Sequence, residues 1–168
     1  GYEVAPESPF ALMSPVEARA WFAYMKVHLR IRYEMNRQLR AGNDLSLADY
    51  DVLVALISEP TVTMSMTALA IRIGWERSRA SHQAKRMADR GLVALGTSET
   101  DRRSTTVALT TAGRAALAAA SPGHADFVRN DVLGVLDHDE LAGFAMALER
   151  IYDRLIERGT LPRPTDHP

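Results

Sequence analysis

The chain has 168 residues, 46% hydrophobic and 24% charged, so we expect one compact folded domain. The absence of cysteine excludes disulfides, thiol redox switches and cysteine-ligated metal sites, and it fits a cytoplasmic protein. The net charge of −1 would by itself argue against a polyanionic partner, and no apolar run is long enough to predict a membrane span.

The N-terminal part predicts a flexible segment followed by a long helix. Residues 1–13 contain prolines and are expected to be flexible. Ser14 can cap the helix, Pro15 suits its first position, and Glu17 completes a capping box. The helix should continue to about Ala41. Its apolar residues cover more than one stripe, so it should need partners on two sides.

Three shorter helices are expected next. Ser46 begins the second helix, and Ser65 begins a short third helix that ends at Gly74. A fourth helix is expected over residues 76–90, and Gly91 suits its C-terminal stop. The narrow buried face of this fourth helix should consist of Ala80, Ala84 and Met87.

The last part of the chain predicts a hairpin and two more helices. Residues 92–97 and 104–109 favour strands, joined by a charged turn. Thr110 should cap an alanine-rich helix, which Ser121-Pro122-Gly123 is expected to break or kink. Asp137 opens a final helix, whose apolar residues recur at three- and four-residue steps, as in a coiled-coil seam.

We therefore predict a mainly α fold with a small β-hairpin wing. A winged helix-turn-helix region should occupy residues 46–109. Residues 14–45 and 110–158 should form a helical dimerisation region, and residues 159–168 a flexible tail.

Positive charge gathers in the middle of the chain. Between Arg72 and Arg103, eight basic residues stand against four acidic ones, so this segment carries +4. One face of the fourth helix has the short polar and long cationic side chains that a helix needs to read a major groove. These candidate DNA contacts are Arg77, Ser78, Arg79, Ser81, His82, Lys85 and Arg86.

Other candidate contacts lie outside this helix. Thr67, at the start of the third helix, is placed to contact a phosphate. Arg102 and Arg103 lie at the hairpin tip and could enter a narrow minor groove. Asp101 is expected to pair with an arginine and brace the tip. A solvated helix face without DNA binding would explain the charges but not the glycine stop, the hairpin and the arginine pair together.

These motifs resemble the MarR family of bacterial winged helix-turn-helix regulators. The resemblance covers residues 14–158 in helix order, and motif-level similarity lies within 66–114. Its motifs are Leu69-Ala70, Ile73-Gly74, Arg77-Ser78, Arg86, Gly91-Leu92-Val93, Asp101-Arg102-Arg103 and Leu109-Thr110-Thr111-Ala112-Gly113-Arg114. Arg79 and His82 stand where many members have threonine and arginine, which leaves the operator sequence open. Ala68 stands where an acidic residue is common, so the third helix lacks the usual capping partner, and Trp75 stands where an aliphatic residue is common.

The resemblance implies a homodimer, formed by the first, fifth and sixth helices, that binds pseudo-palindromic double-stranded DNA operators. Members of the family usually repress transcription. Many release DNA when a small, often aromatic and acidic, molecule binds between the dimer domain and the winged domain. The alternative is a winged-helix protein-interaction module without DNA binding, for which loss of the basic helix face or of the wing arginines would be evidence.

A stripe on the first helix is a candidate ligand site. Trp21, Met25, His28 and Arg32 share one helix face and could bind an aromatic carboxylate. Tyr50 and Trp75 could join them. The alternative is that Trp21 and Met25 belong to the core or the dimer interface, with His28 and Arg32 in solvent.

No other chemistry is indicated. The five histidines are dispersed without metal-ligand spacing, and neither a glycine-rich phosphate loop nor a nucleophile elbow is present. We therefore expect no metal, no cofactor and no enzymatic activity.

Overall fold

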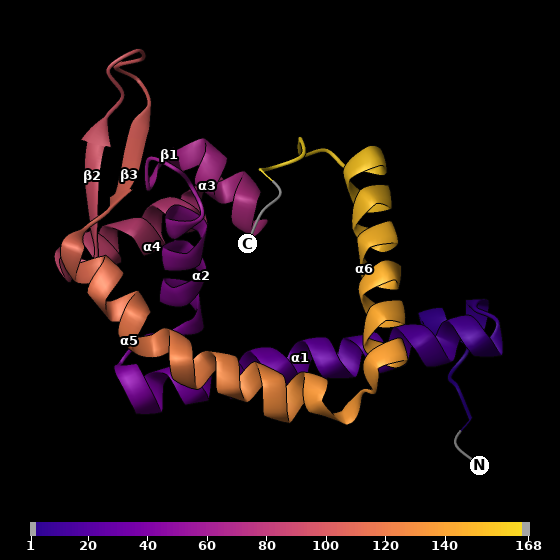
Figure 1. Ribbon diagram of the computed structural model, residues 1–168. Coiled ribbons are helices and arrows are strands. Elements are labelled where there is room, and N and C mark those ends of the chain that lie inside the picture. The colour runs from indigo at the N-terminus through magenta and orange to yellow at the C-terminus, as the bar shows by residue number, and fades with distance from the viewer. Residues whose placement is uncertain (1–2, 166–168) are drawn as a thin grey trace.

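The computed structural model describes residues 3–165. Six α-helices carry most of the chain: α1 (Pro15–Asn43), α2 (Leu47–Ile57), α3 (Met66–Ile73), α4 (Arg77–Asp89), α5 (Thr111–Phe127) and α6 (His138–Arg158). The strands are β1 (Thr63–Ser65), β2 (Val93–Thr97) and β3 (Thr105–Leu109). The mainly α fold with a hairpin wing is confirmed (Figure 1).

Local signals set most helix ends as predicted. Ser14 with Glu17, Ser46 with Asp49 and Asp137 with Glu140 each form a complete capping box. Gly74 ends α3 with φ +68°, a left-handed conformation that favours glycine. Each boundary therefore follows from its own residues.

The sheet has one strand more than the predicted hairpin. Its order is β1-β3-β2, and all pairs are antiparallel. In β1, Met64 lies opposite Val107 of β3, and both side chains are buried. Three residues show no readable alternation, so β1 exists only through its pairing with β3.

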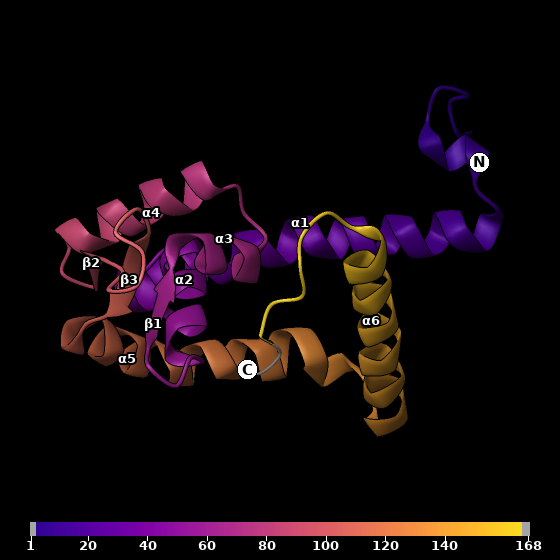
Figure 2. The same ribbon diagram turned by 90° about the horizontal axis from the view of Figure 1, so that it is seen from above.

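α5 is not broken at Ser121-Pro122-Gly123, so that half of the prediction is wrong, whereas a kink at Pro122 stays a prediction. The helix continues through Pro122 to Phe127, and Ser121 donates a hydrogen bond to the carbonyl of Leu117. α5 packs against α1, and a Cβ atom at Gly123, next to the proline, would lie 3.2 Å from the side chain of Gln38 in α1. Figure 2 shows the two helices running in the same general direction. A π-helical turn over Val128–Val132 and a 3-10 turn over Leu133–Val135 lead to α6.

The hydrophobic core lies within the winged region and the adjoining parts of α1 and α5. Its buried residues run from Leu39 to Ala120, whereas α6 has none. Gly113 makes α5 fit here, since a Cβ atom would lie 2.0 Å from the carbonyl oxygen of Leu92. α6 stands apart from α2, α3 and α4, and the chain beyond it leads back toward α3 (Figure 1).

The two ends, both expected to be flexible, contain some ordered contacts. Residues 9–12 form a 3-10 helix capped by Ser8, and Phe10 packs edge-on against Phe22 of α1. Arg72 of α3 donates to the carbonyl of Thr165. Residues 1–2 and 166–168 lie outside the described part. Within the described part, none of the helices is long and apolar enough to cross a membrane.

Candidate nucleic-acid interface

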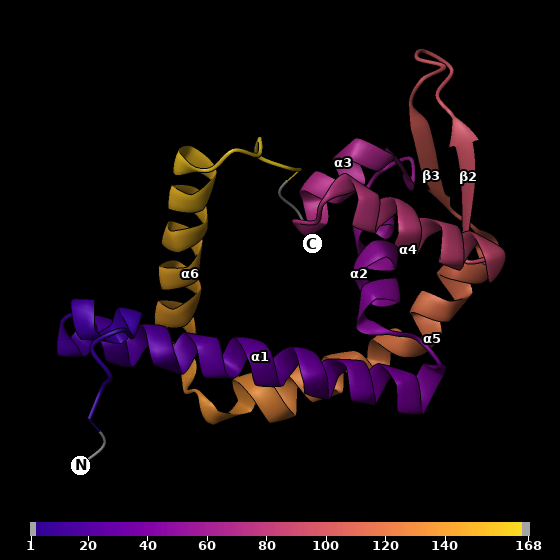
Figure 3. The ribbon, with the colours of Figure 1, turned by 180° about the vertical axis from the view of Figure 1, so that it is seen from behind.

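The helix α4 has a buried face and a charged face. Ala80, Ala84 and Met87 are buried as predicted. The opposite side chains point away from the core: Arg77, Ser78, Arg79, His82, Lys85 and Arg86 are exposed and Ser81 is half-buried. Figure 3 shows α4 lying across α2, with the wing beside it. The core therefore holds this helix so that its cationic face remains in solvent.

Arg79 is ordered by an aromatic neighbour. Its guanidinium lies over the ring of Trp75, 4.0 Å from the ring centroid. Such a cation–π contact restricts a long side chain at the N-terminal end of α4, the part of a recognition helix that approaches base edges. Trp75 is half-buried and packs against the hydrophobic core.

The wing is a twisted hairpin whose tip presents Arg102 and Arg103, both exposed. A carboxylate oxygen of Asp101 accepts a hydrogen bond from the backbone N–H of Arg103 at 3.0 Å, while its carbonyl accepts from Ser104. The hydroxyl of Ser98 accepts from the backbone of Thr100 and Asp101. Asp101 thus contacts the backbone of the tip, where an arginine side chain was expected as its partner.

Thr67 lies exposed in the first turn of α3, whose cap is Ser65. The hydroxyl of Ser65 accepts from the backbone N–H of Ala68. The first turn of α3 contains no acidic side chain that would repel a phosphate or occupy the remaining backbone N–H groups. This arrangement is compatible with the phosphate contact expected for Thr67.

A polar network that sequence reasoning missed lies beneath α4. Asp49 of α2 accepts from Gln83 at 2.6 Å and from Arg90 at 2.7 Å, and Gln83 accepts from Arg86 at 2.7 Å. Gln83 lies on the predicted buried face, so a polar residue among Ala80, Ala84 and Met87 was the available signal.

The six candidate ligand residues do not form one site. Trp21 and His28 both stack on Tyr24 of their own helix, at 5.3 and 5.7 Å between ring centroids. Met25, between them, is half-buried. Trp75 is instead covered by Arg79. The stripe therefore separates into an exposed aromatic part and a part that faces α2.

The second part of the stripe belongs to a cluster between α1, α2 and α5. Arg32 pairs with Asp51 at 3.3 Å. Tyr50 lies 4.5 Å from the His124 ring and within hydrogen-bonding reach of Ser121, 3.4 Å away. Burial raises the pKa of Asp51, although Arg32 opposes this effect, and burial lowers the pKa of His124. The cluster therefore combines the Arg32 cation, the Asp51 carboxyl group, the Tyr50 phenol ring and the His124 imidazole.

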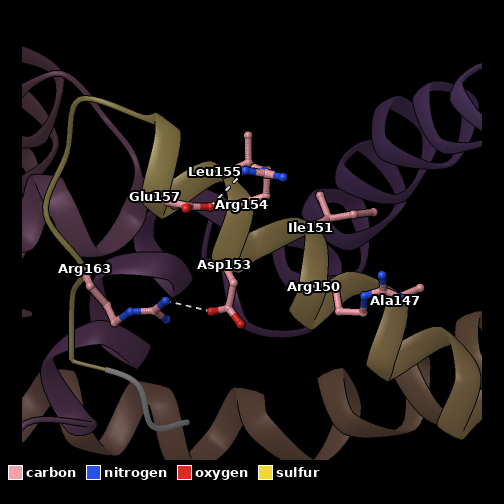
Figure 4. Close-up of a pocket in the computed structure, with 8 residues that line it drawn as sticks. All are labelled: Ala147, Arg150, Ile151, Asp153, Arg154, Leu155, Glu157 and Arg163. Atoms are coloured by element: carbon pink, nitrogen blue, oxygen red, sulfur yellow. Dashed lines mark hydrogen bonds and ion pairs between the residues drawn. The ribbon is translucent and has the colours of Figure 1, made fainter.

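Two open grooves lie on the helices of the predicted dimerisation region. One runs along α6 and is bordered by Arg163, which pairs with Asp153 at 2.7 Å (Figure 4). The other is formed by α1 and the end of α5, with Leu29, Tyr33 and Phe127 among its lining residues. Neither contains any of the candidate ligand residues. No cluster of three or more acidic or histidine side chains suited to a metal ion occurs in residues 3–165.

Comparison with known proteins agrees with this geometry. The family model described as MarR family matches residues 43–104, the winged region. The regulator AbsC from Streptomyces coelicolor is 28% identical, with TM-score 0.80 over 87% of this chain and 98% of that one. Sco3205 from the same organism, solved in complex with DNA, is 27% identical, with TM-score 0.83 over 89% and 97%.

A third relative was solved with a small molecule. PcaV from Streptomyces coelicolor, in complex with its natural ligand, is 25% identical, with TM-score 0.62 over 75% of this chain and 90% of that one. No curated protein matches the sequence significantly. The resemblance to MarR regulators and the winged-helix fold are confirmed. Members of this family are transcriptional regulators and not enzymes, in agreement with the sequence prediction.

Proposed function

We propose that this chain, a transcriptional regulator of the MarR family, is a cytoplasmic homodimeric repressor that reads a pseudo-palindromic operator. The observation that carries the proposal is the position of α4. Its apolar face is buried, its cationic face is in solvent, and the wing arginines lie at the end of the neighbouring hairpin. The DNA complex of the similar Sco3205 supports this assignment.

Within this proposal, α4 enters the major groove and the wing reaches the adjacent minor groove. Arg77, Arg79 and Arg86 can contact guanine edges or phosphates, and the short side chains Ser78 and Ser81 can approach the bases closely. Arg102 and Arg103 place positive charge where a narrow minor groove is most negative.

The dimer would use the apolar surface of the end helices. Trp21, Phe22, Leu29 and Tyr33 of α1 are exposed. So is a series on α6, which we call the α6 seam: Leu141, Phe144, Leu148, Ile151 and Leu155. Exposed apolar surface of this extent is typical of a protein–protein interface. A twofold dimer would hold two α4 helices about 10 base pairs apart on one DNA face.

Regulation by a small aromatic acid would act through the cluster around Arg32. A carboxylate ligand could replace Asp51 as the partner of Arg32, while Tyr50 and His124 provide ring surfaces. The natural-ligand complex of PcaV supports a small-molecule effector. A panel of aromatic acids titrated into the operator complex should contain one that releases DNA, and Arg32→Ala should remove that response. A panel without any effect would refute this part.

Selection from random DNA, followed by sequencing, tests the central proposal. We expect an inverted repeat to be enriched, and gel-shift affinity for it to fall steeply with salt. The logarithm of the binding constant should decrease by about 0.9 per phosphate contact for each tenfold increase in salt. Failure to enrich any sequence would instead favour the protein-interaction module.

A further inference from the structure

We propose that Asp49 and Gln83 are positioning residues for DNA recognition, which act by holding Arg86 and α4 in the orientation that reads the operator. The inference rests on the proposed function, since it concerns the same helix face. It adds residues that do not themselves face DNA.

The two side chains are the buried polar residues of the described core. Asp49 and Gln83 are each 4% exposed, among residues that are otherwise apolar. A buried carboxylate destabilises a fold unless hydrogen bonds and an opposite charge compensate for its lost hydration. A leucine in place of Gln83 would fill the same space without a buried amide that needs hydrogen-bond partners. Asp49 also closes the α2 capping box by accepting from the backbone N–H of Ser46 at 2.9 Å, a role that does not need Gln83. The polar Gln83 beside it therefore suggests a role in orientation, beyond capping and core packing.

The hydrogen bonds form a directed chain. Gln83 Nε2 donates to Asp49 Oδ1 at 2.6 Å, which leaves Gln83 Oε1 to accept from Arg86 Nη2 at 2.7 Å. The reverse amide orientation would place an oxygen against the carboxylate and an N–H group against the guanidinium. Asp49 therefore determines which end of Gln83 faces Arg86.

Arg90 extends the network to the first helix. One of its nitrogens donates to Asp49 Oδ2 at 2.7 Å and another to the carbonyl of Asp44 at 2.8 Å. Asp44 is the C-cap of α1, and Asp49 belongs to α2. The network therefore ties the C-terminal half of α4 to α2 and to the end of the helix that is expected to carry the dimer interface.

The consequence for Arg86 is a restricted guanidinium. One nitrogen is bound to Gln83, and the side chain is exposed, so its other N–H groups remain available for DNA. A long side chain that is ordered before binding loses less conformational entropy when it binds. It also favours one contact geometry, which increases discrimination between operator and unrelated DNA.

A charge-conserving exchange tests the pair. Gln83→Glu alone places two carboxylates in contact and should lower the ratio of operator to random-DNA affinity by about tenfold. Adding Asp49→Asn should restore the ratio, because the introduced asparagine amide can donate to the new carboxylate, which still accepts from Arg86. A structural role alone would lower the melting temperature and reduce affinity for both DNAs equally.

A double-mutant cycle separates Gln83 from general packing. Gln83→Leu should lower the operator-to-random ratio by about tenfold in the wild-type background and leave it unchanged in Arg86→Ala. Equal losses in both backgrounds, or failure of the exchange to restore selectivity, would overturn the inference.

A DNA-free measurement keeps this inference separate from the proposed function. In side-chain NMR, the guanidinium nitrogens of Arg86 should be resolved, as expected for restricted rotation, and should merge in Gln83→Leu. If no DNA sequence is selected, the proposed function fails, and unrestricted Arg86 in the wild type independently refutes the positioning role.

Discussion

Leu53 of α2 and Leu155 of α6 are the same residue type, each within an α-helix, but Leu53 is fully buried and Leu155 is 65% exposed. In the winged region, side chains from α2, α3, α4 and the sheet meet in one core. On α6, the repeating apolar series is exposed, and none of its side chains is buried. Figure 1 shows this helix standing apart from the winged region. The winged region thus forms its hydrophobic core within one chain, whereas α6 keeps apolar side chains exposed in the single chain.

The largest expected effect comes from breaking the α6 seam. Leu148→Glu combined with Ile151→Glu should give a monomer, because two carboxylates would be placed in an apolar interface. Loss of paired half-site binding should weaken operator affinity by about 10²–10⁴-fold. Sedimentation and gel shifts measure both changes, with Glu149→Ala as the control on the same helix. A variant that remains dimeric would refute the proposed interface.

The two leucines themselves provide the next test. Leu53→Ala should lower the free energy of unfolding by about 2–5 kcal/mol, since it opens a cavity in a packed core. Leu155→Ala should have an effect only at protein concentrations where dimers form. Urea denaturation at two concentrations distinguishes these outcomes. Equal, concentration-independent losses would contradict the contrast between the regions.

Within the winged region, Arg79→Ala should weaken operator binding by about 1–3 kcal/mol and relax preference at one base pair. Arg79 lies ordered on Trp75, at the end of α4 that approaches the bases. Binding to a set of single-base operator variants measures this preference. Arg19→Ala, an exposed arginine of α1, is the matched control. If the base preference is unchanged, Arg79 contacts a phosphate and does not contact a base edge.

The wing should show a smaller effect than α4. Arg103→Ala removes one cation from the tip, so it should reduce the salt dependence of log affinity by about 1, with little change in major-groove preference. Gel shifts over a salt series give the slope. A changed base preference with an unchanged slope would argue against a minor-groove or phosphate contact.

The smallest effect concerns His124, in the cluster that adjoins the winged region. Burial lowers its pKa from 6.5, so the unfolded chain binds the proton more readily. Stability from this group should be present above pH 6.5 and be lost as pH falls through the folded-state pKa. Asp51 acts oppositely, because its raised pKa removes stability as pH rises above 3.8.

Melting curves between about pH 7.5 and 5.5 measure the contribution of His124. The melting temperature should fall by about 1–3 °C more in the wild type than in His124→Gln as pH is lowered. His138→Gln, at an exposed position, is the control. An identical pH dependence in wild type and His124→Gln would show that this imidazole does not resist protonation.

Most element ends could be predicted because their causes are local. Ser14, Ser46, Ser65 and Asp137 each cap their own helix, and Gly74 ends α3 in a conformation that favours glycine. Prediction failed where a distant element decides the outcome. The strand β1 depends on β3, and α5 passes through Pro122 while lying along α1.

The candidate interface also has features that local sequence predicts and features that depend on distant contacts. The cationic face of α4 follows from helical spacing, so its residues could be named from the sequence. The bonds from Gln83 to Asp49, 34 positions earlier, and from Arg90 to Asp44 join separate helices and have no local signal. Likewise, helical spacing alone predicts that Trp21, Met25, His28 and Arg32 lie on one face of α1. Only the packing of α1 against α2 shows that Arg32 pairs with Asp51 and so belongs to a different site from Trp21 and His28.

By itself, the sequence determined the helices, their caps, the hairpin and the charged face of α4, because backbone conformation and side-chain periodicity depend on near neighbours. Only the tertiary structure decided that a third strand joins the sheet, that α5 continues past Pro122, and that Asp49, Gln83 and Arg90 meet beneath α4. These features depend on contacts between residues far apart in the chain, and such contacts arise only when the helices pack.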